Sequence, residues 1–249
     1  MMADACTLPP GLKDRVVRPG ELGSQCRDAM FALFVKYYAN VTRIVFEADL
    51  DAKDLVILLD GDSGIAGFTT ASWEDCLIGG RPVTVVFSGD TIVDRAHWGE
   101  QALAKAWLRE MGRLSRACGG RELVWLLIVK GHRTYRYLPA FARRFVPARS
   151  PAGDDTDLLG MRDALAHQRF GDSFDPATGI VRFASPRGNL DPAWAEPSER
   201  ERQLPDVRFF LEANPGFRSG DELACLCSLA RENMKPLAQR WFDAGLHEE

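Results

Sequence analysis

The residues whose chemistry is easiest to name lie in a polar turn, residues 94–103 (DRAHWGEQAL), between an apolar segment and an amphipathic one. If a strand enters this turn and a helix leaves it, the first backbone N–H groups of the helix lack intrahelical partners. The positive end of the helix dipole then favours an anion, and phosphate groups bind at such positions. A capped helix start without a ligand has the same pattern, so the turn alone leaves both interpretations open.

A second polar stretch, residues 130–149, contains six basic side chains and no acidic one. Such a run is either a solvated face or a contact surface for the phosphates of a ligand or for an acidic partner protein. The six are Lys130, Arg133, Arg136, Arg143, Arg144 and Arg149.

A strand–helix–strand–helix unit over residues 83–145 would bring these two stretches together. VTVVFSGDTIV (83–93) and ELVWLLIVK (122–130) are apolar enough for strands, and the second has the continuous pattern of a strand buried on both faces. Residues 95–116 are predicted as one helix, which Gly119 and Gly120 end, and a short helix over 133–145 is interrupted at Pro139. The long helix has one apolar stripe, formed by Leu103, Ala106, Trp107, Met111 and Leu114.

Outside this unit the sequence predicts an N-terminal arm over residues 1–26, several helices and short strands. Residues 28–46 have helical spacing, with residues 41–46 either in the same helix or in a second one, and residues 55–60 and 65–73 form a hairpin around Gly64. A connector rich in Pro and Gly follows Pro147. Beyond it we expect a helix over residues 158–170, strands at 180–183, 207–215 and 221–230, and a final helix over 230–242.

This order predicts an α/β (α+β) fold with a mixed, mostly antiparallel central sheet flanked by helices, since strands and helices do not alternate strictly. We expect residues 1–249 to form a single domain with a core at about 28–147 and a C-terminal extension at about 148–249 that adds strands. A separate C-terminal domain would have little apolar material for a core of its own.

The turn Arg95-Ala96-His97-Trp98-Gly99-Glu100, followed by Leu103, resembles a motif of the GNAT superfamily of CoA-dependent acyltransferases. In that family a strand runs into a turn of the pattern Arg/Gln-x-x-Gly-x-Gly/Ala, and the turn's amides hold the pyrophosphate of acyl-CoA. This chain departs from the pattern because Trp98 and Glu100 stand where the family usually has glycines. The resemblance implies a GNAT-like fold and a donor site formed by Val93, Arg95, Trp98, Gly99, Glu100, Gln101, His132 and Arg133.

The second half of the unit is similar to the same family. The segment 130–138 (KGHRTYRYL) falls where the family has a helix of the pattern Asn-x-x-Ala-x-x-Leu-Tyr, whose tyrosine often protonates the departing thiolate. The resemblance therefore implies Tyr137, or else Tyr135, as the general acid, with both packed in a core as the alternative. The late segment 209–229 is loosely similar to long-chain N-acyltransferases and acyl-homoserine-lactone synthases.

Acyl transfer to an amine also needs a group that removes the amine proton. The candidates are Asp90, His97 and Glu47, with His132 as a further one. We expect Gly89 to mark a bulge that re-aims Asp90, and we expect His97 to open the long helix, where the dipole would keep it neutral. A capping or surface histidine is the alternative for His97.

These features predict an acyltransferase that moves an acyl group from acyl-CoA, or from the acyl-phosphopantetheine of an acyl carrier protein, to a small-molecule amine, without a metal. One alternative is a non-catalytic binding or regulatory protein of the same fold whose turn has lost cofactor binding. A second alternative, an anion- or nucleotide-binding protein, requires only the basic stretch.

The composition argues against other classes. A net charge of −4 and a pI near 5.7 are unfavourable for nucleic-acid binding. We expect a cytoplasmic protein without a signal peptide or a membrane span. The cysteines lack paired spacing and are expected to be free thiols, with Cys225 and Cys227 buried on one face of a strand: Cys6, Cys26, Cys76, Cys118, Cys225 and Cys227.

Overall fold

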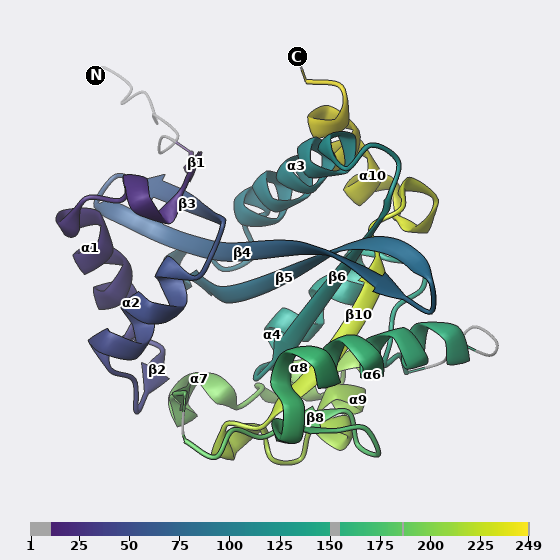
Figure 1. Cartoon of the computed structure of the whole chain (residues 1–249). Helices are drawn as coiled ribbons and strands as arrows, with labels where there is room; N and C mark the ends of the chain where they lie inside the picture. The colour runs from purple at the N-terminus through teal and green to yellow at the C-terminus, as the bar shows by residue number, and fades with distance from the viewer. Residues whose placement is uncertain (1–10, 150–154, 186, 249) are drawn as a thin grey trace, which may run out of the picture.

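The computed structural model describes residues 11–149, 155–185 and 187–248. Part of the expected N-terminal arm, part of the connector and Cys6 lie outside these ranges. Within them, a sheet of eight strands forms the centre of the molecule (Figure 1), in the order β1-β3-β4-β5-β6-β10-β8-β7. The strands are β1 (Lys13–Val17), β3 (Leu55–Gly61), β4 (Gly64–Ile78), β5 (Arg81–Val93), β6 (Glu122–Val129), β7 (Phe174–Asp175), β8 (Ile180–Val181) and β10 (Glu222–Ser228).

Neighbouring strands of this sheet run antiparallel except for β5 and β6, which are parallel and joined by the helix α3 (Ala102–Ala117). The predicted mixed, mostly antiparallel sheet flanked by helices is therefore confirmed. Strands β10, β8 and β7 come from the C-terminal extension and continue the sheet beyond β6. A second, two-stranded sheet pairs β2 (Tyr38–Ala39) with β9 (Asn189–Leu190).

Helices cover both faces of the large sheet (Figure 1). On one face α3 packs against α10 (Pro236–Leu246), and the two backbones approach closely because glycines lie at the crossing. A Cβ atom added at Gly112 would lie 2.1 Å from the carbonyl oxygen of Phe242. The other face packs against α1 (Ser24–Phe34), α2 (Arg43–Asp51) and α6 (Thr156–Phe170). The shorter helices are α4 (His132–Tyr135), α5 (Tyr137–Phe141), α7 (Pro192–Ala195), α8 (Glu199–Arg202) and α9 (Pro205–Ala213).

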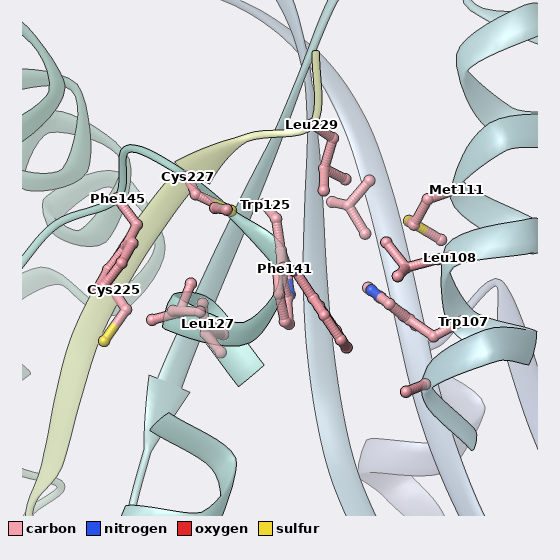
Figure 2. Packing of buried hydrophobic residues seen from close by; sticks show 14 of the residues in the cluster. Trp107, Leu108, Met111, Trp125, Leu127, Phe141, Phe145, Cys225, Cys227 and Leu229 are labelled. Carbon is pink, nitrogen blue, oxygen red and sulfur yellow. The ribbon is translucent and has the colours of Figure 1, made fainter. Parts of the chain in front are cut away.

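The largest core cluster lies between the sheet and the α3–α10 pair, and aromatic rings form its centre (Figure 2). The rings of Trp107 on α3 and Trp125 on β6 are 5.5 Å apart, and Phe141 of α5 lies 6.4 Å from Trp125. The indole N–H of Trp125 donates to the hydroxyl of Ser88 on β5, at 2.9 Å. Strand β6 is thus tied to both its helical cover and its parallel neighbour.

Several segment predictions were wrong. Residues 13–17 form a strand of the sheet rather than an arm. For residues 28–46 the structure selects the alternative with a second helix, since α1 and α2 are separated by β2 and by Asn40 at a φ of 58°. The predicted helix over 95–116 begins only at Ala102. Residues 205–213 form a helix rather than a strand, because Pro205 favours a helix start and Val207 and Phe210 make its buried face.

The short helix expected over 133–145 is divided at Arg136 into α4 and α5, so Pro139 lies inside α5 and does not interrupt it. The final helix begins at Pro236 rather than at residue 230. Other expectations for these segments agree with the structure. The apolar stripe of α3 faces the core, and both Cys225 and Cys227 are buried in the same cluster, where burial raises the pKa of the Cys227 thiol to about 12. The five cysteines in the described ranges are free. None of the helices described is long and apolar enough to cross a membrane.

Candidate active site

The parallel strands β5 and β6 separate at their C-terminal ends. They are in register from Val83 opposite Glu122 to Ser88 opposite Leu127. Beyond Ser88 the register of β5 with β4 shifts by one residue, which is the bulge expected at Gly89. From there β5 pairs only with β4, whereas β6 continues beside β10.

A cavity of about 560 Å³ opens where the two strands part. Its walls come from the end of β5, the turn 95–101, the start of α3, the segment after β6, and α10. The N-terminal region and the C-terminal extension also contribute, through Tyr37, Tyr38, Leu190, Trp194 and Glu201. Most of the lining side chains are apolar or aromatic, as is usual for a small-molecule site.

The end of β5 presents backbone groups to this cavity. The N–H of Asp94 donates to the carbonyl of Ala66 on β4, at 2.7 Å. Because N–H and C=O groups alternate along an antiparallel strand, those of Thr91 and Val93 point away from β4 and toward the cavity. The indole N–H of Trp98 already donates to the carbonyl of Val93, at 2.8 Å. The edge at Thr91 is left open for an extended ligand.

The turn that precedes α3 uses most of its own amides. Asp94 accepts from the N–H of Ala96, at 3.1 Å, so Arg95–His97 forms a short 3₁₀ turn, and Gly99 at a φ of 97° separates it from the helix. His97 therefore does not open the helix, which corrects that expectation. Five of the six N–H groups of residues 95–100 donate within the protein, and only that of Gly99 has no intramolecular acceptor. The acceptors of the five are Tyr37 Oη and oxygen atoms of Asp94, Arg95 and His97.

An aromatic wall covers this turn from the side of the C-terminal extension. Trp98 lies 5.7 Å from Trp194 with the rings edge to face, and Tyr37 contacts both. The guanidinium of Arg133 lies 4.4 Å from the Trp98 ring centre, and that of Arg95 lies 5.3 Å from the Trp194 ring centre. Both arginines that were expected to contact the acyl donor, Arg95 and Arg133, are thus stacked on tryptophan rings.

His132 is the most deeply buried polar side chain in the cavity wall, at 1% exposure. Its Nε2 lies 3.3 Å from a carboxylate oxygen of Glu201, and its Nδ1 is buried without a hydrogen-bond partner. Burial and the neighbouring Arg133 lower the pKa of His132, so the ring is neutral at pH 7. Because the carboxylate can only accept, Nε2 carries the hydrogen and Nδ1 has a free lone pair.

The two tyrosines proposed as general acids lie in different environments. Tyr137 lines the cavity, packs on Phe141 at 5.4 Å, and has its pKa raised by burial. Tyr135 is fully buried in the core, and its hydroxyl donates to the carbonyl of Pro147, at 2.8 Å. Tyr137 is therefore placed to meet a ligand, and Tyr135 is a core residue outside the cavity.

Asp90 lies beside the cavity rather than in its wall. It lies at the bulge of β5, where the charges of Lys53, Lys130 and Glu222 act on it; Lys53 and Glu222 are buried, and Lys130 is partly buried. Burial and the negative charge of Asp49 raise the pKa of Asp90 to about 7, although both lysines oppose the shift.

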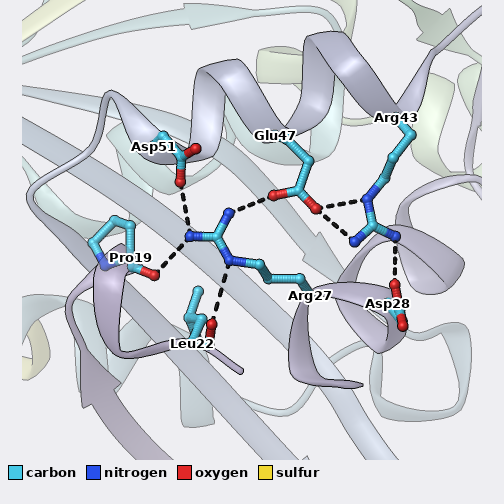
Figure 3. A network of polar contacts seen from close by, with 7 residues as sticks. All are labelled: Pro19, Leu22, Arg27, Asp28, Arg43, Glu47 and Asp51. Carbon is cyan, nitrogen blue, oxygen red and sulfur yellow. Dashed lines mark hydrogen bonds and ion pairs between the residues drawn. The ribbon is translucent and has the colours of Figure 1, made fainter. Parts of the chain in front are cut away.

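Glu47 lies away from the cavity, on α2, in a network of ion pairs (Figure 3). One of its oxygens accepts from Arg27 and the other from Arg43, at 2.6 Å, and Arg27 also reaches Asp51, at 2.7 Å. A carboxylate engaged on both oxygens by arginines is a poor base, so its position is that of a structural residue.

His97, by contrast, lines the cavity, with its Nδ1 2.8 Å from Glu100. Most residues of the predicted acyl-donor site also line the cavity, whereas Arg95 stacks on the ring of Trp194. Those that line it are Val93, Trp98, Gly99, Glu100, Gln101 and Arg133.

The basic stretch 130–149 is largely neutralised within the fold. Lys130 pairs with Glu222, Arg133 with Glu201, Arg144 with Asp155 and Arg149 with Asp206. The stretch therefore acts mainly in tertiary structure, and it gives little support to a separate phosphate surface. In the described ranges, no cluster of three or more His, Cys, Asp or Glu side chains is arranged to hold a metal ion.

No protein-family model and no curated protein matches this chain in sequence. Similar solved structures include a conserved protein of unknown function from Enterococcus faecalis, described as a probable N-acyltransferase. It matches at 16% identity with a TM-score of 0.40, and the match covers 53% of this chain and 33% of that one. A GNAT family N-acetyltransferase from Escherichia coli in complex with CoA matches at 16% identity over 54% and 72% of the two chains, with a TM-score of 0.37. A glucosamine-6-phosphate N-acetyltransferase from Arabidopsis thaliana matches at 15% identity over 47% and 82%, with a TM-score of 0.35.

Proposed function

We propose that this chain is a GNAT-type acyltransferase that moves an acyl group from a pantetheine thioester, either acyl-CoA or an acyl carrier protein, to a small-molecule amine. The observation that carries the proposal is the cavity at the parted ends of β5 and β6, because an open strand edge and two ionisable side chains meet there. A pantetheine arm is extended and contains amides, so it can pair with the edge at Thr91 as an added strand would.

The reaction requires one bond to form and one to break. The amine nitrogen attacks the thioester carbonyl carbon, the carbon–sulfur bond breaks, and the products are an amide and a thiol. A base must take one proton from the amine, and an acid must give one to the departing thiolate. The backbone N–H of Thr91 faces this space, so we assign it the polarisation of the thioester carbonyl.

We assign the base to His132 and the acid to Tyr137. His132 suits a base because it is neutral and its Nδ1 lone pair has no internal donor. Tyr137 suits an acid because burial raises its pKa and keeps the hydroxyl protonated until a thiolate needs the proton. Asp90 is the second candidate for the base, since it directly precedes the cavity-lining Thr91 on β5 and its pKa of about 7 matches that role.

The proposal also includes a single domain over residues 1–249. Strands from the C-terminal extension lie in the same sheet as those of the core, and the cavity takes Leu190, Trp194 and Glu201 from that extension. The extension would then be part of the active site rather than a separate module.

A non-catalytic binding or regulatory role is the second candidate, favoured by the side chains of Trp98 and Glu100 in the turn. Under that role, Tyr137→Phe, His132→Ala and His97→Ala leave the protein's function unchanged. Calorimetric titration with acyl-CoAs of several chain lengths and with acyl carrier proteins, followed by a thiol-release assay over a panel of amines, tests both candidates. Thioester binding with thiol release supports catalysis, whereas binding without turnover, or no thioester binding at all, refutes catalysis and favours the second role.

A further inference from the structure

We infer that Arg133 is a positioning residue, which docks the C-terminal extension on the active site and aims Glu201 at His132. The inference rests on the proposed function and deepens it, because it names a residue that acts on the proposed base through another group. The GNAT-like pattern would instead place Arg133 among the residues that bind the acyl donor. The two roles predict different results when this side chain is changed.

Arg133 touches three walls of the cavity with one guanidinium group. From α4, its Nη1 donates to the backbone carbonyl of Trp194 on α7, at 2.7 Å, and its Nη2 donates to the carboxylate of Glu201 on α8, at 3.3 Å. The guanidinium also lies 4.4 Å from the ring centre of Trp98, in the turn before α3. Three segments that are distant in the sequence therefore meet on one side chain.

Glu201 is shared between two neighbouring residues of α4. Its Oε1 lies 3.3 Å from Nε2 of His132, while its Oε2 accepts from Nη2 of Arg133. Ser198 also donates to Oε2, but Ser198 and Glu201 belong to one capping box at the start of α8. The serine therefore fixes Glu201 within the extension, whereas Arg133 fixes it relative to His132.

These contacts matter for geometry more than for stability. The side chains of Arg133 and Glu201 are 33% and 22% exposed, and ion pairs this open to solvent add little to the free energy of folding. A guanidinium donates in fixed directions from a planar fork, which a lysine ammonium cannot reproduce. Because a base must lie within hydrogen-bond distance of the proton it takes, a small shift of α8 would lower turnover without unfolding the protein.

The charges around His132 make this role measurable. Burial, Arg133 and Arg136 lower the pKa of His132, and Glu201 raises it. Loss of the Arg133 charge therefore raises this pKa, whereas loss of the Glu201 charge lowers it. The acid limb of the pH–rate profile, where His132 becomes protonated, moves in the same direction as the pKa.

The kinetic test uses Arg133→Met, which removes the charge and the fork, and Arg133→Lys, which keeps the charge but not the fork. In an assay of thiol release we expect both variants to lower kcat by about 10- to 100-fold, with KM for the acyl donor changed by less than about threefold. The acid limb should move to higher pH in Arg133→Met and stay in place in Arg133→Lys. A normal kcat with KM raised tenfold or more would mean that Arg133 binds the donor, and it would overturn the inference.

A second measurement needs no turnover. NMR titration of the His132 imidazole, assigned by comparison with His132→Gln, gives its pKa in any folded variant. Glu201→Gln should lower that pKa in the wild-type background, and the same substitution should have less than half the effect in the Arg133→Met background, because Glu201 is no longer aimed at the ring. Equal effects in the two backgrounds would show that Glu201 is positioned without Arg133, which also overturns the inference.

Arg200→Met is the matched control. Arg200 is an exposed residue of α8 beside Glu201, and its side chain makes no hydrogen bond or ion pair within the described ranges. We expect the kinetics and the His132 pKa of this variant to match the wild type, and a loss of kcat as large as in Arg133→Met would overturn the assignment. If the wild type itself releases no thiol, the proposed function fails, while the titration still decides the role of Arg133.

Discussion

His132 and Glu201 are 69 residues apart in the sequence, yet His132 Nε2 lies 3.3 Å from Glu201 Oε1. The carboxylate is itself fixed, because the backbone N–H and the hydroxyl of Ser198 donate to it at 2.8 and 2.7 Å. Against the effect of burial, these bonds lower the pKa of Glu201 to about 2. Glu201 is therefore ionised at neutral pH and selects the His132 tautomer with hydrogen on Nε2. In the proposed mechanism Glu201 is a positioning residue, supplied by the C-terminal extension.

The first prediction concerns Glu201→Gln. Glu201 raises the pKa of His132, against burial and Arg133, so its removal lowers that pKa further and weakens the base. We expect kcat to fall by about 10- to 100-fold with KM nearly unchanged. The acid limb of the pH–rate profile, which lies below 6.5 in the wild type, should move to lower pH.

A purely structural role for Glu201 would lower activity in proportion to lost folding and would leave the pH limb in place. Circular dichroism and thermal melts of the same preparation separate these cases. An unmoved limb with a normal melting curve would refute the assignment of His132 as the base.

The second prediction compares two tyrosines that lie two positions apart. Tyr137→Phe removes a hydroxyl that faces the cavity, so thiol release should slow by about 10²-fold while the melting temperature stays close to that of the wild type. Tyr135→Phe removes the donor to the carbonyl of Pro147 in the core, so it should cost about 1 kcal/mol of unfolding free energy and leave kcat of the folded fraction intact. The reverse pattern, in a thiol-release assay and denaturant titration, would exchange the two roles.

The sequence predicted those elements whose apolar period is long and regular. Strands β3 to β6, most of α3, and β10 could be located in this way. The bulge could also be predicted, because Gly89 is a glycine inside a strand pattern. The start of α3 could not, because the cap by Asp94 and the positive φ of Gly99 override a continuous helical spacing. For α9, the apolar run Val207, Phe209, Phe210 and Leu211 also fits a strand pattern, and the burial of Val207 and Phe210 on one helix face decides between the two.

The residues that line the cavity were predicted only where they lie in one local unit. Tyr137, His132 and the turn could be placed beside one another because they follow consecutive elements. Trp194 and Glu201 could not, since they reach the cavity by long-range packing of the extension. The sequence Ser198-x-x-Glu201 is a readable capping box, and the structure forms one, but it carries no sign that Glu201 also meets a histidine.

The third prediction concerns Asp90 and pH. Its pKa is 3.8 ordinarily and about 7 in the folded protein, so the folded state binds the extra proton between these values. Its contribution to stability is therefore present at low pH and is lost as pH rises toward 7. Asp90→Asn removes the titration, and it should raise the melting temperature relative to the wild type at pH 8 more than at pH 4.5. A relative gain of 1 kcal/mol corresponds to about 2–4 °C, and parallel pH curves for the two proteins would contradict the prediction.

The fourth prediction concerns the close crossing of α3 and α10, which closes one side of the cavity. A Cβ atom at Gly245 would lie 1.8 Å from the carbonyl oxygen of Arg109, so Gly245→Ala must push the helices apart. We expect a loss of about 1–3 kcal/mol in unfolding free energy and weaker thioester binding, since α10 contributes Trp241 to the cavity wall. Gly160→Ala on the exposed face of α6 is the matched control, because nothing lies within 4 Å of its added Cβ. Alanine there should instead stabilise the helix by about 0.5–1 kcal/mol, and equal effects of the two substitutions in urea unfolding would refute the close packing.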